Sequence, residues 1–259
     1  MATRSFHETL CAYPSRHLVS ALLALLSYLG RHLTGSGGRK ARWCLASLAL
    51  CLSLSVSSWD FDRLISRAQH LYALDQAATQ RIRDWQQLLL DQQRQELQGQ
   101  LLQVNLFFNN QLRFADDLEI WQEVDYWATP IEALGKGAAD CEDYAIAKYV
   151  SLKKLGVAPE QLRLTYVKAL ELNQAHMVLA WYPTPDSEPL ILDNLTDEIL
   201  PASQRSDLVP VYSFNTTGLW LAGAQNNAQT GSARQLSRWQ DLLKKMHNEG
   251  FEEPGSPLP

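Results

Sequence analysis

The protein has 259 residues, and its formal net charge at pH 7 is −5. This mild acidity, without a cluster of Lys and Arg outside the first 58 residues, argues against a dedicated nucleic-acid-binding protein, which would usually carry a basic face. Hydrophobic residues make up 46% of the chain, which is enough for an ordinary packed core, and the length suits one domain with additions or two small domains.

The first 58 residues have the pattern of an export leader. A basic patch, Arg39-Lys40-Ala41-Arg42, precedes an apolar run over residues 43–56, and two serines follow that run. This order is typical of a secretory signal peptide, so we predict export and cleavage near Ser58. The apolar runs of the leader are shorter than the ~20 residues that a membrane-spanning helix needs. Two alternatives stay open, namely an uncleaved membrane anchor and a true start downstream of Met1.

Helical patterns dominate the first half of the exported chain. Apolar residues recur at helical spacing through residues 59–104, which predicts an amphipathic helical pair that covers a core. An aromatic-rich connection over residues 105–137 follows. Within it, Thr129-Pro130 opens a short helix, because proline suits the first helical position, and two glycines end that helix. A further helix is expected over residues 141–155, with Gly156 placed to end it.

The hydrophobic period then changes from helical to alternating, which predicts strands. Four strands are expected, over residues 162–167, 176–182, 189–193 and 210–214. We therefore predict an α+β fold in which the 141–155 helix packs on an antiparallel sheet. Residues 59–222 would form this domain. Residues 223–259 would form a polar, partly disordered tail with a short helix around residues 236–246.

One cysteine stands apart from the others in this organisation. Three of the four cysteines lie in the leader: Cys11, Cys44 and Cys51. Cys141 would therefore be the only thiol of the exported chain, although export into an oxidising compartment normally encourages disulfides. A lone cysteine with a histidine and an aspartate further along the chain is the pattern of a thiol nucleophile. The candidate partners are His176 and Asp193.

Together these three residues could perform acyl transfer from an amide. In the first turn of a helix, backbone N–H groups and the helix dipole would favour the thiolate of Cys141, and its backbone N–H could bind a developing oxyanion. His176 could take the thiol proton and later protonate a leaving amine, while Asp193 would hold the imidazole in the right tautomer. Structural alternatives stay open: an inert core cysteine, a hydrogen-bonded core histidine, and acids that only start a helix.

The acids beside the cysteine, Asp140, Glu142 and Asp143, create an electrostatic conflict. Negative charge near a thiol raises the thiol pKa and so disfavours the thiolate. A bound cation would remove the conflict, and carboxylate oxygens suit Ca²⁺, which takes ~6–8 oxygen ligands. We therefore predict Asp140 and Glu142 as calcium ligands. Backbone, water, Asp143 or Asn173 would complete the shell.

The sequence resembles the bacterial transglutaminase-like cysteine proteinases over roughly residues 59–221. The resemblance rests on three segments around the candidate residues, with Tyr126–Pro130 as further support: Gly137–Tyr149, Ala175–Leu179 and Leu192–Asn194. It implies a papain-like or transglutaminase-like core with the catalytic triad at Cys141, His176 and Asp193. It also implies calcium dependence through the acids next to the cysteine.

The resemblance further implies a biological setting. The expected substrate is the N-terminal region of a giant surface adhesin, cut in the periplasm at a pair of alanines, and cutting would release the adhesin and disperse a biofilm. The expected regulator is an inner-membrane receptor that holds the protease when cytoplasmic cyclic-di-GMP is high. The protease itself would not bind that nucleotide. This chain departs from the family pattern in its longer leader and in the long polar tail after Trp220.

Two other classes of function are compatible with the same residues. A transglutaminase or a peptidoglycan-directed amidase would form the same acyl-enzyme, so the triad alone does not separate these enzymes from a protease. A non-catalytic adaptor would instead bind a membrane partner through an aromatic surface.

Overall fold

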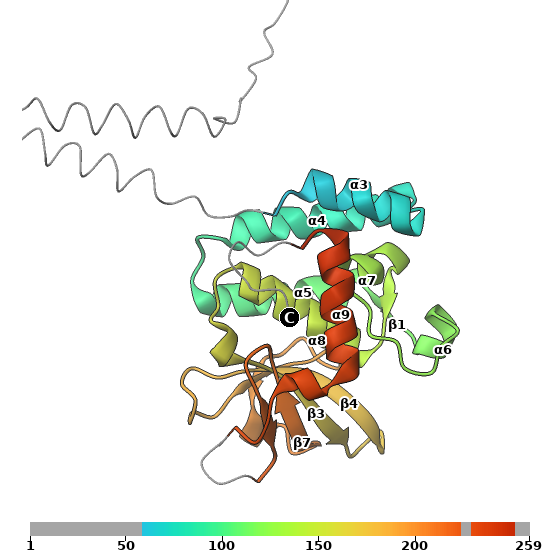
Figure 1. Ribbon diagram of the computed structural model, residues 1–259. Coiled ribbons are helices and arrows are strands. Elements are labelled where there is room, and N and C mark those ends of the chain that lie inside the picture. The colour runs from blue at the N-terminus through green and yellow to red at the C-terminus, as the bar shows by residue number, and fades with distance from the viewer. Residues whose placement is uncertain (1–58, 224–228, 252–259) are drawn as a thin grey trace, which may run out of the picture. The chain divides into compact units, whose positions relative to one another are not determined.

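The computed structural model describes residues 59–223 and 229–251 (Figure 1). The predicted leader, residues 1–58, lies outside the described residues, and so does the end of the predicted tail, residues 252–259. Over the two described stretches, no helix combines the length and the apolar character needed to cross a bilayer.

Three helices open the described chain and form its outer layer: α3 (Phe61–Tyr72), α4 (Gln76–Gln92) and α5 (Leu97–Gln111). Asp60 and Asp75 cap α3 and α4 by accepting hydrogen bonds from backbone N–H groups of the first turn, as short acidic side chains do at helix starts. The helical pattern predicted for residues 59–104 is therefore confirmed, but the expected pair was wrong, because three helices form there. The predicted connection over 105–137 was wrong in its first part, because α5 continues to Gln111.

The central layer is α8 (Cys141–Lys154), which contacts the sheet on one side and α5 on the other. Its residues from Asp143 to Leu152 are all buried, so this helix is enclosed and not amphipathic. Before it, α6 (Asp117–Ile120) and α7 (Pro130–Lys136) flank a small parallel ladder of two strands. Gly137 ends α7 in a left-handed conformation, which leads the chain directly into the ladder and α8.

The ladder and the main sheet contain eight strands in the described chain. Strands β1 (Arg113–Phe114) and β2 (Ala138–Ala139) pair in parallel. The main sheet has the order β6-β5-β4-β3-β7-β8, and every neighbouring pair is antiparallel. Its bounds are β3 (Leu162–Ala169), β4 (Gln174–Trp181), β5 (Leu190–Leu192), β6 (Leu200–Pro201), β7 (Leu208–Phe214) and β8 (Leu219–Leu221). The predicted α+β fold is confirmed, and the short strands β1, β2, β6 and β8 add to the four expected from the pattern.

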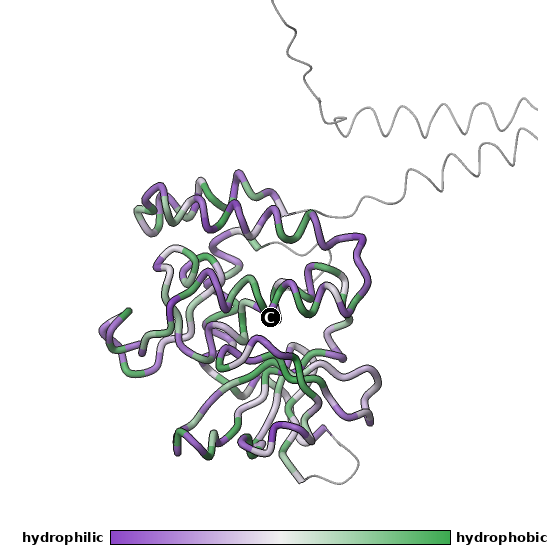
Figure 2. Tube along the Cα trace, turned by 180° about the vertical axis from the view of Figure 1, so that it is seen from behind, coloured by the Kyte–Doolittle hydropathy of each residue, from purple (hydrophilic) through white to green (hydrophobic). Residues whose placement is uncertain are grey.

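One hydrophobic core joins the helical layers to the sheet. In Figure 2 the outer helices α3 and α4 carry more hydrophilic residues than the strands at the centre of the sheet. This distribution matches their positions, because α3 and α4 cover the core from outside while the central strands are covered by α8.

The C-terminal segment belongs to the same core. Helix α9 (Ser237–Glu249) runs along the molecule beside α7 and α8 (Figure 1). Trp239, Leu242 and Phe251 are buried in the core cluster that also contains residues of α3, α4 and α8. A domain boundary at residue 222, with a polar tail after it, is therefore wrong for residues 229–251. The helix predicted around 236–246 is present, and its apolar face is what holds the segment in place.

Candidate active site

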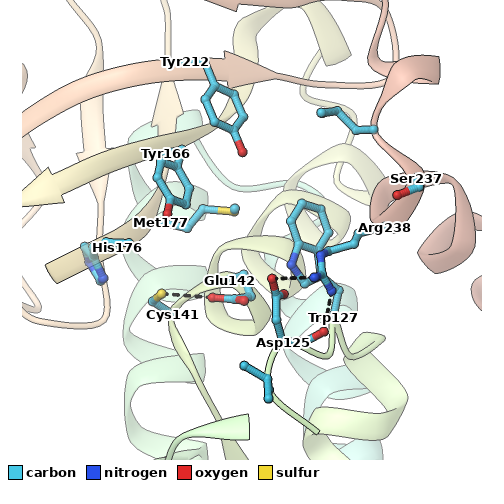
Figure 3. A pocket seen from close by; sticks show the side chains of 13 residues that line it. Asp125, Trp127, Cys141, Glu142, Tyr166, His176, Met177, Tyr212, Ser237 and Arg238 are labelled. Atoms are coloured by element: carbon cyan, nitrogen blue, oxygen red, sulfur yellow. Dashed lines mark hydrogen bonds and ion pairs between the residues drawn. The ribbon is translucent and has the colours of Figure 1, made fainter.

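Cys141 lies at the first position of α8 and opens onto a cleft of about 660 Å³ (Figure 3). Residues from six separate segments of the chain line this cleft: Trp127, Cys141, Tyr166, His176, Tyr212 and Arg238. Asp140 has an extended backbone with φ −99° and ψ −171°, so the helix begins at the cysteine. The Cys141 side chain is partly buried, and the volume of the cleft is in the usual range of ligand pockets.

The sheet brings His176 and Asp193 together. His176 lies on β4, and Asp193 follows directly after β5, which pairs with β4 in antiparallel register. The distance from His176 Nε2 to Asp193 Oδ1 is 2.7 Å, and both side chains are buried. Because His176 Nε2 is hydrogen-bonded to Asp193, the other ring nitrogen, Nδ1, is the one available to a group in the cleft. Figure 3 shows the His176 ring and the Cys141 sulfur on the same side of that cleft.

Asp193 is held as a carboxylate. Burial by itself would raise the pKa of Asp193, but hydrogen bonds from His176, the Leu195 N–H and Arg205 lower it to about 2. Arg205 Nη2 lies 2.8 Å from Asp193 Oδ2 and also donates to Asp207. An ionised aspartate that accepts from a histidine ring is the arrangement that stabilises an imidazolium.

The opposite flank of Cys141 is acidic. Its thiol donates a hydrogen bond to Glu142 Oε2 over 3.0 Å, and the Met177 N–H donates to the sulfur. Burial, followed by the negative charges of Glu142 and Asp140, raises the pKa of the Cys141 thiol well above its ordinary value. The electrostatic conflict expected from the sequence is thus present in the structure.

Three carboxyl groups converge beside the cysteine. Asp117, Asp140 and Glu142 each place a ligand oxygen within 4.8 Å of the others. Burial and the neighbouring carboxylates of Asp143, Glu142 and Asp117 raise the pKa of Asp140 to about 10, and burial raises the pKa of Asp117 to about 6. Oδ1 of Asp140 and Oδ1 of Asp117 are buried and accept no hydrogen bond from the described residues. These unpaired oxygens fit a hard divalent cation.

The comparisons with known proteins agree with this geometry. The family model of the bacterial transglutaminase-like cysteine proteinases matches residues 72–226. The chain belongs to this family. The family assignment makes the protein a protease that uses a cysteine, with the transglutaminase-like fold described above. A search of curated protein sequences gives no match.

Solved structures of a Legionella pneumophila protein, LapG, are similar to this chain. One LapG structure has 43% sequence identity and a TM-score of 0.62, and the match covers 72% of this chain and 97% of LapG. An EGTA-treated LapG structure has 43% identity and a TM-score of 0.64 over the same shares. A calcium-bound LapG structure has 44% identity and a TM-score of 0.60, covering 70% of this chain and 98% of LapG.

The structure places the sequence-predicted residues of this family member in two groups. Cys141 and His176 both line the cleft and Asp193 is hydrogen-bonded to His176, while Asp140 and Glu142 lie together with Asp117. Asp143 and Asn173 are not members of that three-carboxyl group, although the charge of Asp143 acts on Asp140. The Asp143 carboxyl group is fully buried and accepts from the Ala128 N–H over 2.7 Å, and burial raises its pKa well above the ordinary value. Asn173 lies in the turn between β3 and β4.

Sequence reasoning missed Asp117 and Arg205. Asp117 starts the four-residue helix α6, which carries no sequence pattern strong enough to predict it. Arg205 follows a short 3₁₀ turn, Ala202–Gln204, between two strands. The only available signal was the presence of Arg and Asp residues in the domain. A buried Arg or Asp needs a partner, but the sequence does not specify which residue that partner is.

Proposed function

We propose that the protein is a calcium-dependent cysteine endopeptidase that works in the periplasm. The observation that carries this proposal is the meeting of Cys141 and the His176–Asp193 pair at one cleft, with three carboxyl groups beside the thiol. Membership of the cysteine proteinase family supports the hydrolytic reaction. The predicted signal peptide supports export.

The proposed reaction uses the residues of the cleft in sequence. His176 Nδ1 takes the thiol proton, and the Cys141 thiolate attacks the peptide carbonyl carbon. The Cys141 N–H, at the start of α8, donates to the oxyanion that forms. The His176 imidazolium, stabilised by Asp193, then protonates the leaving amine, and an acyl-enzyme remains on the sulfur. Water activated by His176 hydrolyses the thioester and restores the thiol.

We propose that Asp117, Asp140 and Glu142 hold Ca²⁺. The unpaired buried oxygens of two of them, and the calcium-bound state of the similar LapG structure, support this assignment. Bound calcium would supply positive charge that offsets the carboxylates around the thiol and so favours its thiolate. Glu142 Oε2 accepts the hydrogen bond of the Cys141 thiol. If this oxygen bound Ca²⁺ instead, His176 would remain as the acceptor of the thiol proton.

We propose that the substrate is the N-terminal region of a large surface adhesin, whose cleavage would release it and disperse a biofilm. The proposed regulator is an inner-membrane receptor that holds the protease when cyclic-di-GMP is high. Both assignments rest on the family resemblance of the motifs around Cys141, His176 and Asp193.

Cleavage of a recombinant adhesin N-terminal domain from the same genome tests the proposal. The protein would be assayed with calcium, with a chelator, and as Cys141→Ala. Cleavage that requires both calcium and Cys141 is the expected result. The absence of cleavage by folded protein under every condition would overturn the proposal.

A transferase reaction is the second candidate, because hydrolysis and transfer share the acyl-enzyme. Adding a lysine-containing acceptor peptide to the same assay separates the two reactions. A cross-linked product in place of two fragments would identify a transglutaminase. An adaptor role predicts instead that Cys141→Ala keeps its effect on biofilm dispersal in cells.

A further inference from the structure

The side chain of Asp193 needs support that the sheet does not provide. Strand β5 ends at Leu192, and Asp193 starts an irregular segment that leads to β6. An aspartate beyond the end of a strand has no ladder to fix its backbone. Asp193 is nevertheless 1% exposed, so its two carboxylate oxygens must find partners in the protein.

A side chain of α5 anchors the backbone of this segment. Asn109 of α5 donates to the backbone oxygens of Asp193 and Thr196 and to the side chain of Asp197. Asn109 in turn accepts from Lys148 of α8. These bonds fix the backbone of the segment, but none of them reaches the Asp193 carboxylate.

Arg205 holds the carboxylate itself. Its Nη2 lies 2.8 Å from Asp193 Oδ2, on the side away from His176. The same guanidinium forks onto Asp207, with Nε 3.0 Å from Oδ1 and Nη2 2.8 Å from Oδ2. Asp207 thereby fixes the plane of the guanidinium. Asp193 Oδ1 accepts from His176 and from the Leu195 N–H, so both oxygens of Asp193 are engaged.

We propose that Arg205 is a positioning residue of the catalytic centre, which acts on His176 through Asp193. The proposal rests on the proposed function, because it assigns Arg205 to the proposed triad. Without a cation beside it, a carboxyl group buried in this way would favour its neutral form, which stabilises an imidazolium poorly. Without the fork, the carboxylate could rotate and lose its alignment with Nε2.

Lys148, a second cation near Asp193, does not replace Arg205. Its Nζ is directed to Asn109 Oδ1 over 2.7 Å, and burial lowers the pKa of Lys148 to about 7. A lysine that is partly neutral at physiological pH and bonded to an amide is a weaker partner for a carboxylate. The groups that face the Asp193 carboxylate directly are His176, the Leu195 N–H and Arg205.

Arg205→Met and Arg205→Lys variants of the full chain test the proposal. Methionine removes the charge and the fork, whereas lysine keeps the charge alone. Arg163→Met is the matched control, because Arg163 is also a buried arginine of the sheet domain but packs on Tyr182 and Trp220, away from the triad. Each variant would be checked by circular dichroism and its melting temperature.

Two measurements then separate positioning from general stability. The first is kcat and KM for a peptide substrate as a function of pH. The second is the rate of Cys141 alkylation by iodoacetamide, which reports the reactive thiolate without any substrate turnover. For Arg205→Met we expect kcat to fall by about 10- to 100-fold with little change in KM, which is the range for losing one hydrogen bond to a charged group. The acid limb of the kcat profile should move to higher pH, and Arg205→Lys should recover part of kcat.

Each possible outcome bears on the proposal. Folded Arg205→Met with wild-type kcat and an unmoved acid limb would overturn it, and so would Arg163→Met losing as much activity. If Arg205→Met does not fold, Arg205→Lys decides, because wild-type kcat in that variant would show that the fork is not needed. If wild-type protein cleaves no adhesin while Arg205→Met still slows alkylation, the proposed substrate fails and the positioning role stands.

Discussion

Carboxyl groups lie on both sides of Cys141, and the pKa values on the two sides are shifted in opposite directions. On the sheet side, Asp193 is buried and its pKa is lowered to about 2. On the helix side, Asp140 is partly buried, and its pKa is raised to about 10. The same chemical group therefore has opposite charge preferences at two edges of one cleft.

The difference follows from the partners and not from burial. Asp193 faces a guanidinium, a histidine ring and a backbone N–H, so the protein itself satisfies its charge. Asp140 faces the carboxyl groups of Asp143, Glu142 and Asp117 and leaves one buried oxygen unpaired. The sheet side is thus complete within the chain, whereas the helix side is arranged for a cation from solution.

The largest effect on kcat should come from a substitution on the sheet side, where the protein itself satisfies the Asp193 charge. Asp193→Asn would leave His176 without its charged partner and with the wrong tautomer favoured. We expect kcat to fall by roughly 10³- to 10⁴-fold, as for the aspartate of a hydrolase triad. The measurement is kcat with the adhesin fragment. Asp186→Asn, an exposed change in the loop after β4, is the control, and a loss below tenfold in Asp193→Asn would contradict the comparison.

Removing calcium should weaken the helix side without touching the sheet side. At calcium concentrations near 100 times the Kd, binding to the folded state alone stabilises a protein by about 2.7 kcal/mol. For a domain of this size that corresponds to a rise in Tm of about 5 to 10 °C. Scanning calorimetry with calcium and with chelator would measure it. An equal Tm in both conditions would show that the three carboxyl groups do not form a cation site.

The ligand set can be sharpened by single substitutions. Asp117→Asn, Asp140→Asn and Glu142→Gln should each weaken calcium binding at least about tenfold, the lower end of the loss seen even for outer-shell partners of metal sites. Asp143→Asn should leave the affinity nearly unchanged, because Asp143 accepts from Ala128 and lies outside the group. Isothermal titration would measure the four affinities. The reverse order, with Asp143 essential and Asp117 silent, would restore the ligand set predicted from the sequence.

These two sides were not equally accessible from the sequence. Cys141, His176 and Asp193 could be nominated because few cysteines and histidines lie after residue 58, and because alternation and helical spacing placed the three residues on a helix and two neighbouring strands. Antiparallel pairing of β4 with β5 then brings the last two together. Scarcity of candidates and strong periodicity made the prediction possible.

The missing parts share a different physical cause. The positions of Asp117 and Arg205, and the packing of the predicted helix α9 into the core, depend on contacts between distant segments, and local pattern carries no information about such contacts. Asp143 stays a predicted ligand that the structure does not place within the three-carboxyl group. Successive residues of a helix point in different directions, and Asp143 Oδ1 accepts from the Ala128 N–H.

A third buried carboxyl group tests whether partners alone decide these preferences. Glu249 of α9 is 1% exposed and accepts from the hydroxyl groups of Tyr72 and Thr129, while Lys245 donates to Glu132 instead. Glu249 therefore has donors, as Asp193 has, but no cation within residues 59–223 and 229–251 forms an ion pair with it. Burial raises the pKa of Glu249 to about 7, above the ordinary value of 4.5.

This intermediate case predicts the smallest effect, on stability. The folded state keeps the Glu249 proton at pH values where the unfolded chain has lost it, so the stabilisation is complete below about pH 4.5 and is lost as the pH rises through 7. We expect about 1 kcal/mol of unfolding free energy to disappear between pH 6 and 8. Urea titration of wild type and Glu249→Gln, each with saturating calcium, measures it, because the difference between the two cancels other groups that titrate in this range. If the unfolding free energies of wild type and Glu249→Gln changed equally with pH, the two hydroxyl donors would stabilise the Glu249 carboxylate as effectively as Arg205 stabilises that of Asp193. A cation would then not be the deciding partner of a buried carboxylate.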